Sequence, residues 1–187
     1  SCDAFSAIDA GNRPMSDLIP AWVNGILTPV DKLEVHRMGL RHPAVSVFVL
    51  AGQEVLLQRR ALGKYHTPGL WANTCCSHPH WGETAASCAR RRLWQELGIA
   101  DADPVYRDRI EYRAAVGGGL TEHEVVELFV VNARRDLAVN LNPAEVAEVL
   151  WIGVDDLKRD VAINAERYTP WLRIYLAEHE DRIFRSG

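Results

Sequence analysis

The run PAVSVFVL at positions 43–50 most strongly limits what this chain can fold into. It is apolar and rich in β-branched residues, a composition typical of a buried strand. The segment AGQE follows at 51–54 and the apolar VLLQRR at 55–60, so the chain turns back on itself. The two runs together predict a β-hairpin.

A helix is predicted over ETAASCARRRLWQELG at 83–98, because good helix formers run through it and Gly98 is placed to end it. The apolar residues that gather on one side of this helix are Ala85, Cys88, Ala89, Leu93 and Leu97. The segment before it, 61–82, is too rich in glycine, proline and histidine to be helical.

Three more strands are predicted at 105–116, 122–133 and 148–153, the first two joined through GGGL. A short helix is predicted at 154–160, and a longer one over 165–184 that is entered or kinked at Pro170. Hairpins mixed with a central helix imply an α/β fold, or an α+β layered sheet. Order along the chain does not fix the topology.

The 187 residues are expected to form one domain over 15–187, preceded by a disordered tail at 1–14, since Met15 can itself be a natural start. The net charge of −4 argues against a nucleic-acid partner. No apolar run is long enough to cross a bilayer, so no membrane partner is expected either. Four cysteines in a chain of this length do not form a disulfide framework, and we expect a cytoplasmic protein.

The stretch WANTCCSHPHWGE at 71–83 raises a question of chemistry. Cysteine zinc sites usually separate their cysteines by two residues, whereas these two are adjacent. In extended backbone, residues two apart share a face, so Cys76 and His78 should face together while Cys75 points into packing. The stretch predicts one exposed thiol beside one imidazole. A buried inert cysteine and a strained Cys75–Cys76 redox pair stay open here.

Two other segments carry groups able to bind a cation. EHE at 122–124 heads a predicted strand, so Glu122 and Glu124 lie on one face and His123 on the other. Such paired carboxylates either face solvent or share a cation. Upstream, His36 and His42 are expected in a loop that leads into the first strand, and each alone is more often a surface or core residue than a ligand.

The helical run RRLWQELGI resembles the second half of the Nudix box. The residues that fit the box are Arg91, Glu96, Gly98 and Ile99. Arg92 and Gln95 stand where hydrolases of that superfamily carry acids, and Ser77 stands where the box opens with glycine. Because the lost carboxylates are those that gather magnesium for nucleotide hydrolysis, a standard Nudix hydrolase is disfavoured.

Taken with this altered box, the Cys–His stretch resembles the type I isopentenyl diphosphate isomerase family, whose motif runs Trp-x-Asn-Ser/Thr-x-Cys-x-His-Pro. The matching residues here are Trp71, Asn73, Thr74, Cys76, His78 and Pro79. The resemblance covers roughly residues 20 to 175, with several motifs in the same order. It implies a Nudix-type mixed sheet between helices, and metal-dependent isomerisation of isopentenyl diphosphate to dimethylallyl diphosphate by protonation and deprotonation, feeding isoprenoid biosynthesis.

The same resemblance implies a divalent ion, Mg²⁺ or Mn²⁺, held by three histidines and two glutamates. The positions that match are His36, His42, His78, Glu122 and Glu124. Nitrogen and oxygen ligands together suit manganese better than calcium. A second Mg²⁺ would bridge the substrate diphosphate and Glu96 of the helix. The remaining histidines match no ligand position and are expected to be structural: His66, His80, His123 and His179.

For catalysis the resemblance implies Cys76 and Glu124 as the acid–base pair, with Tyr112 as an assisting hydroxyl. The residues implied to bind the substrate diphosphate are Lys32, Arg60, Lys64 and Arg92, with Trp171 offering a π face to the cationic intermediate. A solvated basic loop, and a core role for Trp171, are the alternatives for these residues. The expected partner is a small isoprenoid diphosphate, bound by a monomer or a homodimer.

Two other functions stay open: a Nudix hydrolase of a nucleoside diphosphate derivative, and a metal-stabilised binding module that uses the Cys–His loop. The second predicts that Cys76 ligates the metal, whereas an isomerase leaves that thiol free. The chain also departs from the family in having Ser77 in place of a usual glycine. A positive φ at Ser77 would strain its loop.

Overall fold

The structure, a computed structural model, describes residues 17–184, so the tail predicted at 1–14 lies outside the described residues. A seven-stranded mixed sheet forms its centre, with strand order β5-β4-β3-β8-β7, while β6 pairs with β3 and β9 with β4. The strands of this sheet are β3 (Arg41–Ala51), β4 (Glu54–Arg60), β5 (Trp71–Ala72), β6 (Cys75–Ser77), β7 (Val105–Gly117), β8 (Leu120–Asn132) and β9 (Val146–Gly153).

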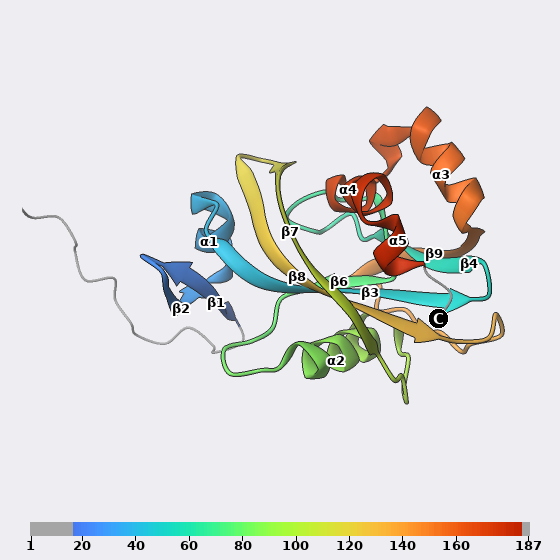
Figure 1. Cartoon of the computed structure of the whole chain (residues 1–187), viewed down its shortest axis with the longest axis horizontal. Helices are drawn as coiled ribbons and strands as arrows, with labels where there is room; N and C mark the ends of the chain where they lie inside the picture. The colour runs from blue at the N-terminus through green and yellow to red at the C-terminus, as the bar shows by residue number, and fades with distance from the viewer. Residues whose placement is uncertain (1–16, 185–187) are drawn as a thin grey trace, which may run out of the picture.

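Helices cover both faces of the sheet (Figure 1). On one face lies α2 (Ala85–Leu97), and on the other lie α3 (Val154–Ile163), α4 (Pro170–Glu178) and α5 (Glu180–Ile183). Each face has its own apolar core, one with Cys88 and Leu93 of α2 and one with Leu172 and Tyr175 of α4. The predicted layered α/β fold is therefore confirmed.

The predicted β3–β4 hairpin is confirmed, but β3 makes its longest pairing elsewhere. β3 and β4 are antiparallel and directly paired only at their turn, with Leu50 opposite Val55 and Ala51 opposite Glu54. Over its whole length β3 runs parallel to β8, which in turn is antiparallel to β7. Sequence order could not show this central parallel pair, because five other elements lie between its two strands: β4, β5, β6, α2 and β7.

The segment before β3 is not the expected loop. It holds a separate hairpin, β1 (Leu18–Val23) and β2 (Ile26–Asp31), followed by helix α1 (Lys32–Met38). The hairpin turns at Asn24 and Gly25, both with positive φ, and an Asn-Gly pair is a strong hairpin signal that the sequence did contain. Asp31 caps α1 by accepting from the backbone N–H groups of Leu33 and Glu34.

This correction moves two candidate ligands. His36 lies on helix α1 and His42 lies inside strand β3, so neither stands in a loop. The predicted helix over 165–184 is also corrected: a 3₁₀ turn at Ala165–Arg167 precedes α4, which begins at Pro170, and a break at His179 separates α4 from α5. Pro170 stands at the start of α4, where its missing N–H costs nothing.

Helix α2 ends as predicted at Gly98, whose φ is +62°. The segment after β8 closes this end of the helix, since the N–H of Asn140 donates to the Leu97 carbonyl over 2.8 Å and that of Asn142 to the Glu96 carbonyl over 2.9 Å. The site residue Glu96 is thereby fixed at a rigid helix end.

We expect Gly98→Ala to lower the free energy of unfolding by about 2 to 4 kcal/mol, from left-handed strain plus overpacking. A Cβ there would lie 2.7 Å from the Asn140 carbonyl oxygen. Gly52→Ala is the matched control, because Gly52 has nearly the same φ, +61°, with nothing within 4 Å of its Cβ. Chemical denaturation should give the control a loss of only about 1 kcal/mol. Equal losses would contradict a role for the Asn140 contact.

Candidate active site

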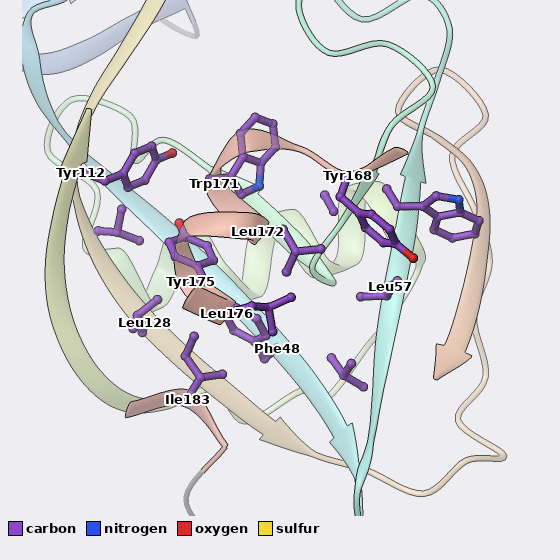
Figure 2. Close-up of a cluster of buried hydrophobic side chains, with 14 of the residues drawn as sticks. Phe48, Leu57, Tyr112, Leu128, Tyr168, Trp171, Leu172, Tyr175, Leu176 and Ile183 are labelled. Carbon is purple, nitrogen blue, oxygen red and sulfur yellow. The ribbon is translucent and has the colours of Figure 1, made fainter. Parts of the chain in front are cut away.

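Strand register brings three of the predicted site residues into one row. Glu124 of β8 lies directly opposite His42 of β3 on one side and Tyr112 of β7 on the other. Since side chains alternate along a strand, Glu122 shares the face of Glu124, and Ser46 shares the face of His42. This is the face that carries the core beneath α4, so the polar row continues an apolar layer that holds Phe48 and Leu128 (Figure 2).

A pocket opens beside this row. The predicted site residues that line it are Lys32, Arg60, Lys64, Cys76, His78, Arg92, Glu96, Tyr112, Glu122, Glu124 and Trp171. His36 and His42 lie behind the pocket wall and are fully buried. Residues from α1, β4, β6, α2, β7, β8 and α4 thus meet in one place.

The hydrogen bonds of His36 and His42 fix which ring nitrogen is free. Nδ1 of His36 is 2.7 Å from the Lys32 carbonyl, and Nδ1 of His42 is 2.7 Å from the Leu40 carbonyl. A carbonyl can only accept, so in each ring Nδ1 carries the proton and Nε2 has the lone pair. Both Nε2 atoms are buried without a hydrogen-bond partner within residues 17–184.

These free nitrogens suit a metal ion. The ligand atoms of His36, His42, His78 and Glu124 all lie within 4.8 Å of one another. Burial lowers the pKa of His36 to about 4 and lowers that of His78 well below its usual value, so these imidazoles are neutral at pH 7 and able to bind a cation. The residues therefore fit the divalent ion that the resemblance implies.

Glu122 lies apart from these four ligand atoms. It forms a second group with His36 and His66, whose ligand atoms also lie within 4.8 Å of one another. Its neighbour His66 was expected to be structural, yet it lines the pocket beside the predicted site. No spacing pattern identified His66, because it precedes the Cys–His motif and reaches the site only through the path of the 61–70 segment.

The two glutamates are linked by the Tyr112 hydroxyl, which is 2.7 Å from Glu122 Oε2 and 2.9 Å from Glu124 Oε2. Burial, followed by the negative charge of Glu124, raises the pKa of Glu122 well above its usual value. Burial also acts to raise the pKa of Glu124, but its contacts with the histidines of the site, among them the 2.8 Å hydrogen bond with His78, outweigh it and lower that pKa well below its usual value. The two shifts have opposite signs, so Glu122 is the carboxyl group of the pair that favours its proton.

The Cys76 thiol sits in a defined hydrogen-bonding environment. Its Sγ donates to Asn73 Oδ1 over 2.9 Å and is 3.3 Å from the Ser46 hydroxyl, which is 2.7 Å from the Tyr175 hydroxyl. The Asn73 amide is held in this orientation because its Nδ2 donates to the Val47 and Cys75 carbonyls. Burial raises the pKa of Cys76 to about 12, so the thiol keeps its proton at neutral pH.

The two adjacent cysteines point to opposite sides of β6, as predicted. Cys75 is fully buried in the core beneath α2, whereas Cys76 lines the pocket. Both are free thiols, so the redox-pair alternative receives no support. Ser77 lies in the extended β6 strand and is absent from the described non-glycine residues with positive φ, so the expected strain does not arise.

Four basic side chains also line the pocket and form its basic wall: Lys32, Arg60, Lys64 and Arg92. Lys64 Nζ is 2.5 Å from Glu145 Oε2, and Arg92 is 3.3 Å from the same oxygen. Burial, followed by the charges of Lys64 and Arg92, lowers the pKa of Lys32 to about 8. These basic side chains outnumber the two carboxylates that pair with them, Glu96 and Glu145, so the wall is suited to binding an anion.

Glu96 of α2 is engaged on both of its oxygens. Oε1 accepts from Arg92 Nη2 over 2.5 Å, and Oε2 accepts from Gln58 Nε2 over 2.8 Å. Gln95 stands where the Nudix box carries an acid, and its side-chain oxygen accepts from Arg91 and Arg92. One magnesium-binding carboxylate of the box is thus replaced by a neutral amide.

Trp171, drawn on α4 in Figure 2, also lines the pocket. The Arg60 guanidinium stands 5.3 Å from the centre of its ring, a cation–π distance. The indole is 2 % exposed, so the core role considered for it is also fulfilled. Its Nε1 has no hydrogen-bond partner among the described residues.

Comparison with known proteins places this geometry in a family. The NUDIX domain model matches residues 40–172. Proteins named isopentenyl-diphosphate Delta-isomerase from Cereibacter sphaeroides and Dinoroseobacter shibae are each 64% identical over 91% of this chain, covering 96% and 97% of their own lengths. One of the same name from Ruegeria pomeroyi is 58% identical over 91% of this chain and 94% of its own.

Solved structures show the same fold at low identity. A Deinococcus radiodurans protein aligns with a TM-score of 0.60 and 17% identity over 76% of this chain and 83% of its own. A Nudix hydrolase from M. smegmatis aligns with a TM-score of 0.57 and 20% identity, over 88% of this chain and 92% of its own. No helix within residues 17–184 is long and apolar enough to cross a membrane. By its matched domain and its identity to curated relatives, the chain belongs to the isopentenyl-diphosphate Delta-isomerase family of NUDIX-fold proteins.

Proposed function

We propose that this protein isomerises isopentenyl diphosphate to dimethylallyl diphosphate, for use in isoprenoid synthesis. Moving an unactivated double bond requires one proton to be added at one carbon and another to be removed from a neighbouring carbon. The observation that carries the proposal is the meeting of the Cys76 thiol and the Glu124 carboxylate in a single pocket between an apolar core and a basic wall.

The thiol and the carboxylate supply the two proton-transfer groups. The raised pKa of Cys76 favours a protonated thiol, and the lowered pKa of Glu124 favours a carboxylate, which contacts the Tyr112 hydroxyl. One group gives a proton to the substrate as the other takes one away, and both must be reset before the next turnover. The indole of Trp171 gives the carbocation-like intermediate a π face, which is worth about 2 kcal/mol when desolvated.

A divalent ion fits beside this pair. His36, His42, His78 and Glu124 would hold Mg²⁺ or Mn²⁺, with Glu122 as the fifth residue of the proposed set. When bound, such an ion lowers the pKa of a coordinated carboxyl group and so adjusts the acidity of Glu124. Glu96 would hold a second Mg²⁺ that helps to neutralise the diphosphate, and Arg92, Lys32 and Lys64 would bind diphosphate oxygens.

The direct test is incubation of the purified protein with isopentenyl diphosphate and Mg²⁺ or Mn²⁺, followed by NMR. Dimethylallyl diphosphate should appear, while neither phosphate nor nucleotide is released from a panel of nucleoside diphosphate derivatives. Hydrolysis without isomerisation would overturn the proposal in favour of a Nudix hydrolase. Absence of both, together with unfolding when metal is removed, would favour a metal-stabilised binding module.

Loss of a basic side chain should weaken substrate binding more than the chemistry. We expect Lys64→Ala or Arg60→Ala to raise KM roughly 10- to 150-fold. This rise corresponds to about 1.5 to 3 kcal/mol of substrate-binding free energy, the contribution of one charge-assisted hydrogen bond. Steady-state kinetics will measure it. Arg59→Ala is the control, because Arg59 is the next residue along the chain but does not line the pocket. Its side chain donates to the Gly69 carbonyl and lies 3.9 Å from Glu148. Turnover of the free alcohol at the parent rate would contradict diphosphate recognition.

A further inference from the structure

His66 is the one imidazole in the pocket lining that the family motifs leave without a role. It lies in the segment between β4 and β5 and is 6% exposed. Its Nε2 is 3.5 Å from Glu122 Oε1, and its Nδ1 is 3.0 Å from the Thr67 hydroxyl. The ring therefore turns one nitrogen toward the site and the other toward its own loop.

The distance between His66 and Glu122 is long for a hydrogen bond but suits two ligands of one ion. Ligand atoms that each lie about 2.1 Å from a metal ion stand about 3.0 to 3.4 Å apart, depending on the geometry. His42 Nε2 and Glu124 Oε1, two atoms of the proposed metal set, are also 3.5 Å apart. By this internal standard, His66 and Glu122 are spaced as a ligand pair.

His36 joins His66 and Glu122 to the other ligands. The ring of His36 is stacked on that of His66, with centroids 5.8 Å apart, and lies 5.0 Å from that of His42. Because its Nδ1 is bonded to the Lys32 carbonyl, only Nε2 is free, and one lone pair binds one ion. The group with His42, His78 and Glu124 and the group with His66 and Glu122 both include His36. We therefore treat them as two sides of a single ion site.

The loop holds the His66 ring in place. Arg60 Nη2 donates to the His66 carbonyl over 3.1 Å, and the Gly69 N–H donates to the Arg60 carbonyl over 3.0 Å. The Trp171 ring meets the imidazole edge-on with centroids 5.8 Å apart. Thr67 has a φ of +45°, a strained value for a threonine, and such strain is more common at functional sites.

We propose that His66 is a further metal-binding residue of this protein, which holds the divalent ion on its Glu122 side together with His36. The inference rests on the proposed function only in taking the ion site as real. Its consequence is a fourth imidazole at the site. Imidazole nitrogen suits Co²⁺ and Zn²⁺ better than Mg²⁺, which prefers carboxylate and water. His66 should therefore bias the site toward transition metals.

The test uses Co²⁺ alone, because its visible absorption reports the ligands around it without any assay of activity. Metal-free parent protein, His66→Gln and His66→Ala are titrated with Co²⁺ and then with competing Mg²⁺. We expect both variants to bind Co²⁺ at least about tenfold more weakly, with an altered spectrum. Mg²⁺ affinity should change by less than about threefold. His66→Gln keeps a side chain of similar length, which guards against collapse of the loop.

His123→Ala is the matched control. His123 is the histidine between the two glutamates on β8, but it points to the other face and is 2.9 Å from Glu111 Oε1. The His123→Ala variant should have the Co²⁺ affinity and the absorption spectrum of the parent protein.

Parent-like affinity and spectrum in both His66 variants would overturn the inference while leaving the proposed function intact. Weaker binding with an unchanged spectrum would place His66 outside the coordination shell, supporting Glu122 rather than ligating, and would also overturn it. A parent protein that binds no Co²⁺ would overturn the inference together with the metal site of the proposed function.

Discussion

Replacement of Cys76 by alanine is expected to lower kcat by about 10³-fold or more, since general acid–base groups typically contribute 10² to 10⁴. The thiol lines the pocket, and its proton is directed by the bond to Asn73 Oδ1. Within residues 17–184 no other thiol is placed to replace it, because Cys75 and Cys88 are both buried in the core on the α2 side of the sheet. KM should change little, since the basic wall is untouched.

Two measurements separate lost chemistry from a lost fold. The Cys76→Ala protein should retain parent metal content, because the thiol is not among the ligand atoms of either metal-capable group. Cys75→Ala should keep turnover near the parent value while losing some stability, because its side chain fills the core. In D₂O the parent enzyme should place deuterium in the product's methyl groups. Normal turnover by Cys76→Ala would remove this thiol from the mechanism.

Glu124→Gln should be the most damaging single change, abolishing detectable turnover and weakening metal binding together. The carboxylate serves twice: it is a proposed proton-transfer group, and its Oε1 lies 2.8 Å from His78 Nε2 and 3.5 Å from His42 Nε2. An amide has no negative charge to attract a cation, and it neither gains nor loses a proton near neutral pH. Metal analysis after dialysis and steady-state kinetics will measure the two losses.

Glu127→Gln is the control for this variant. Glu127 belongs to the same strand, but it pairs with Arg109 over 3.0 Å, away from the site pocket. The Glu127→Gln variant should keep metal content and turnover within about twofold of the parent values, because an ion pair with an exposed arginine contributes little. Full metal content in Glu124→Gln with lost turnover would keep its proton-transfer role and reject it as a ligand.

Much of the fold could be predicted because its signals are local. The run at 43–50 identified β3, and the helix formers before Gly98 identified α2 to within two residues at either end. Alternation within β8 correctly put Glu122 and Glu124 on one face, and alternation within β6 separated Cys75 from Cys76. Each of these inferences depends only on residues within one or two turns or strand steps.

Segment 18–38 holds a hairpin that was not predicted and a helix at His36 where a loop was expected, because its signals are weak or short. Its hairpin has Pro20 and Pro29 facing each other, and proline is uncommon in strand interiors. Helix α1 is only seven residues long and depends on the Asp31 cap and the Gly39 end for its limits. His36 was therefore assigned to a loop, although its place on a capped helix is what fixes its Nε2 toward the site.

The amino-acid sequence alone shows which chemical groups the protein carries: a thiol, imidazoles, paired carboxylates and basic side chains in motifs that resemble one family. Which of these groups meet depends on the packing of distant segments. The parallel β3–β8 pairing sets Glu124 opposite His42, and a register slip of one residue would have turned the carboxylate to the other face. The path of the 61–70 segment brought His66 beside Glu122, since contacts between distant segments depend on packing that no local spacing encodes.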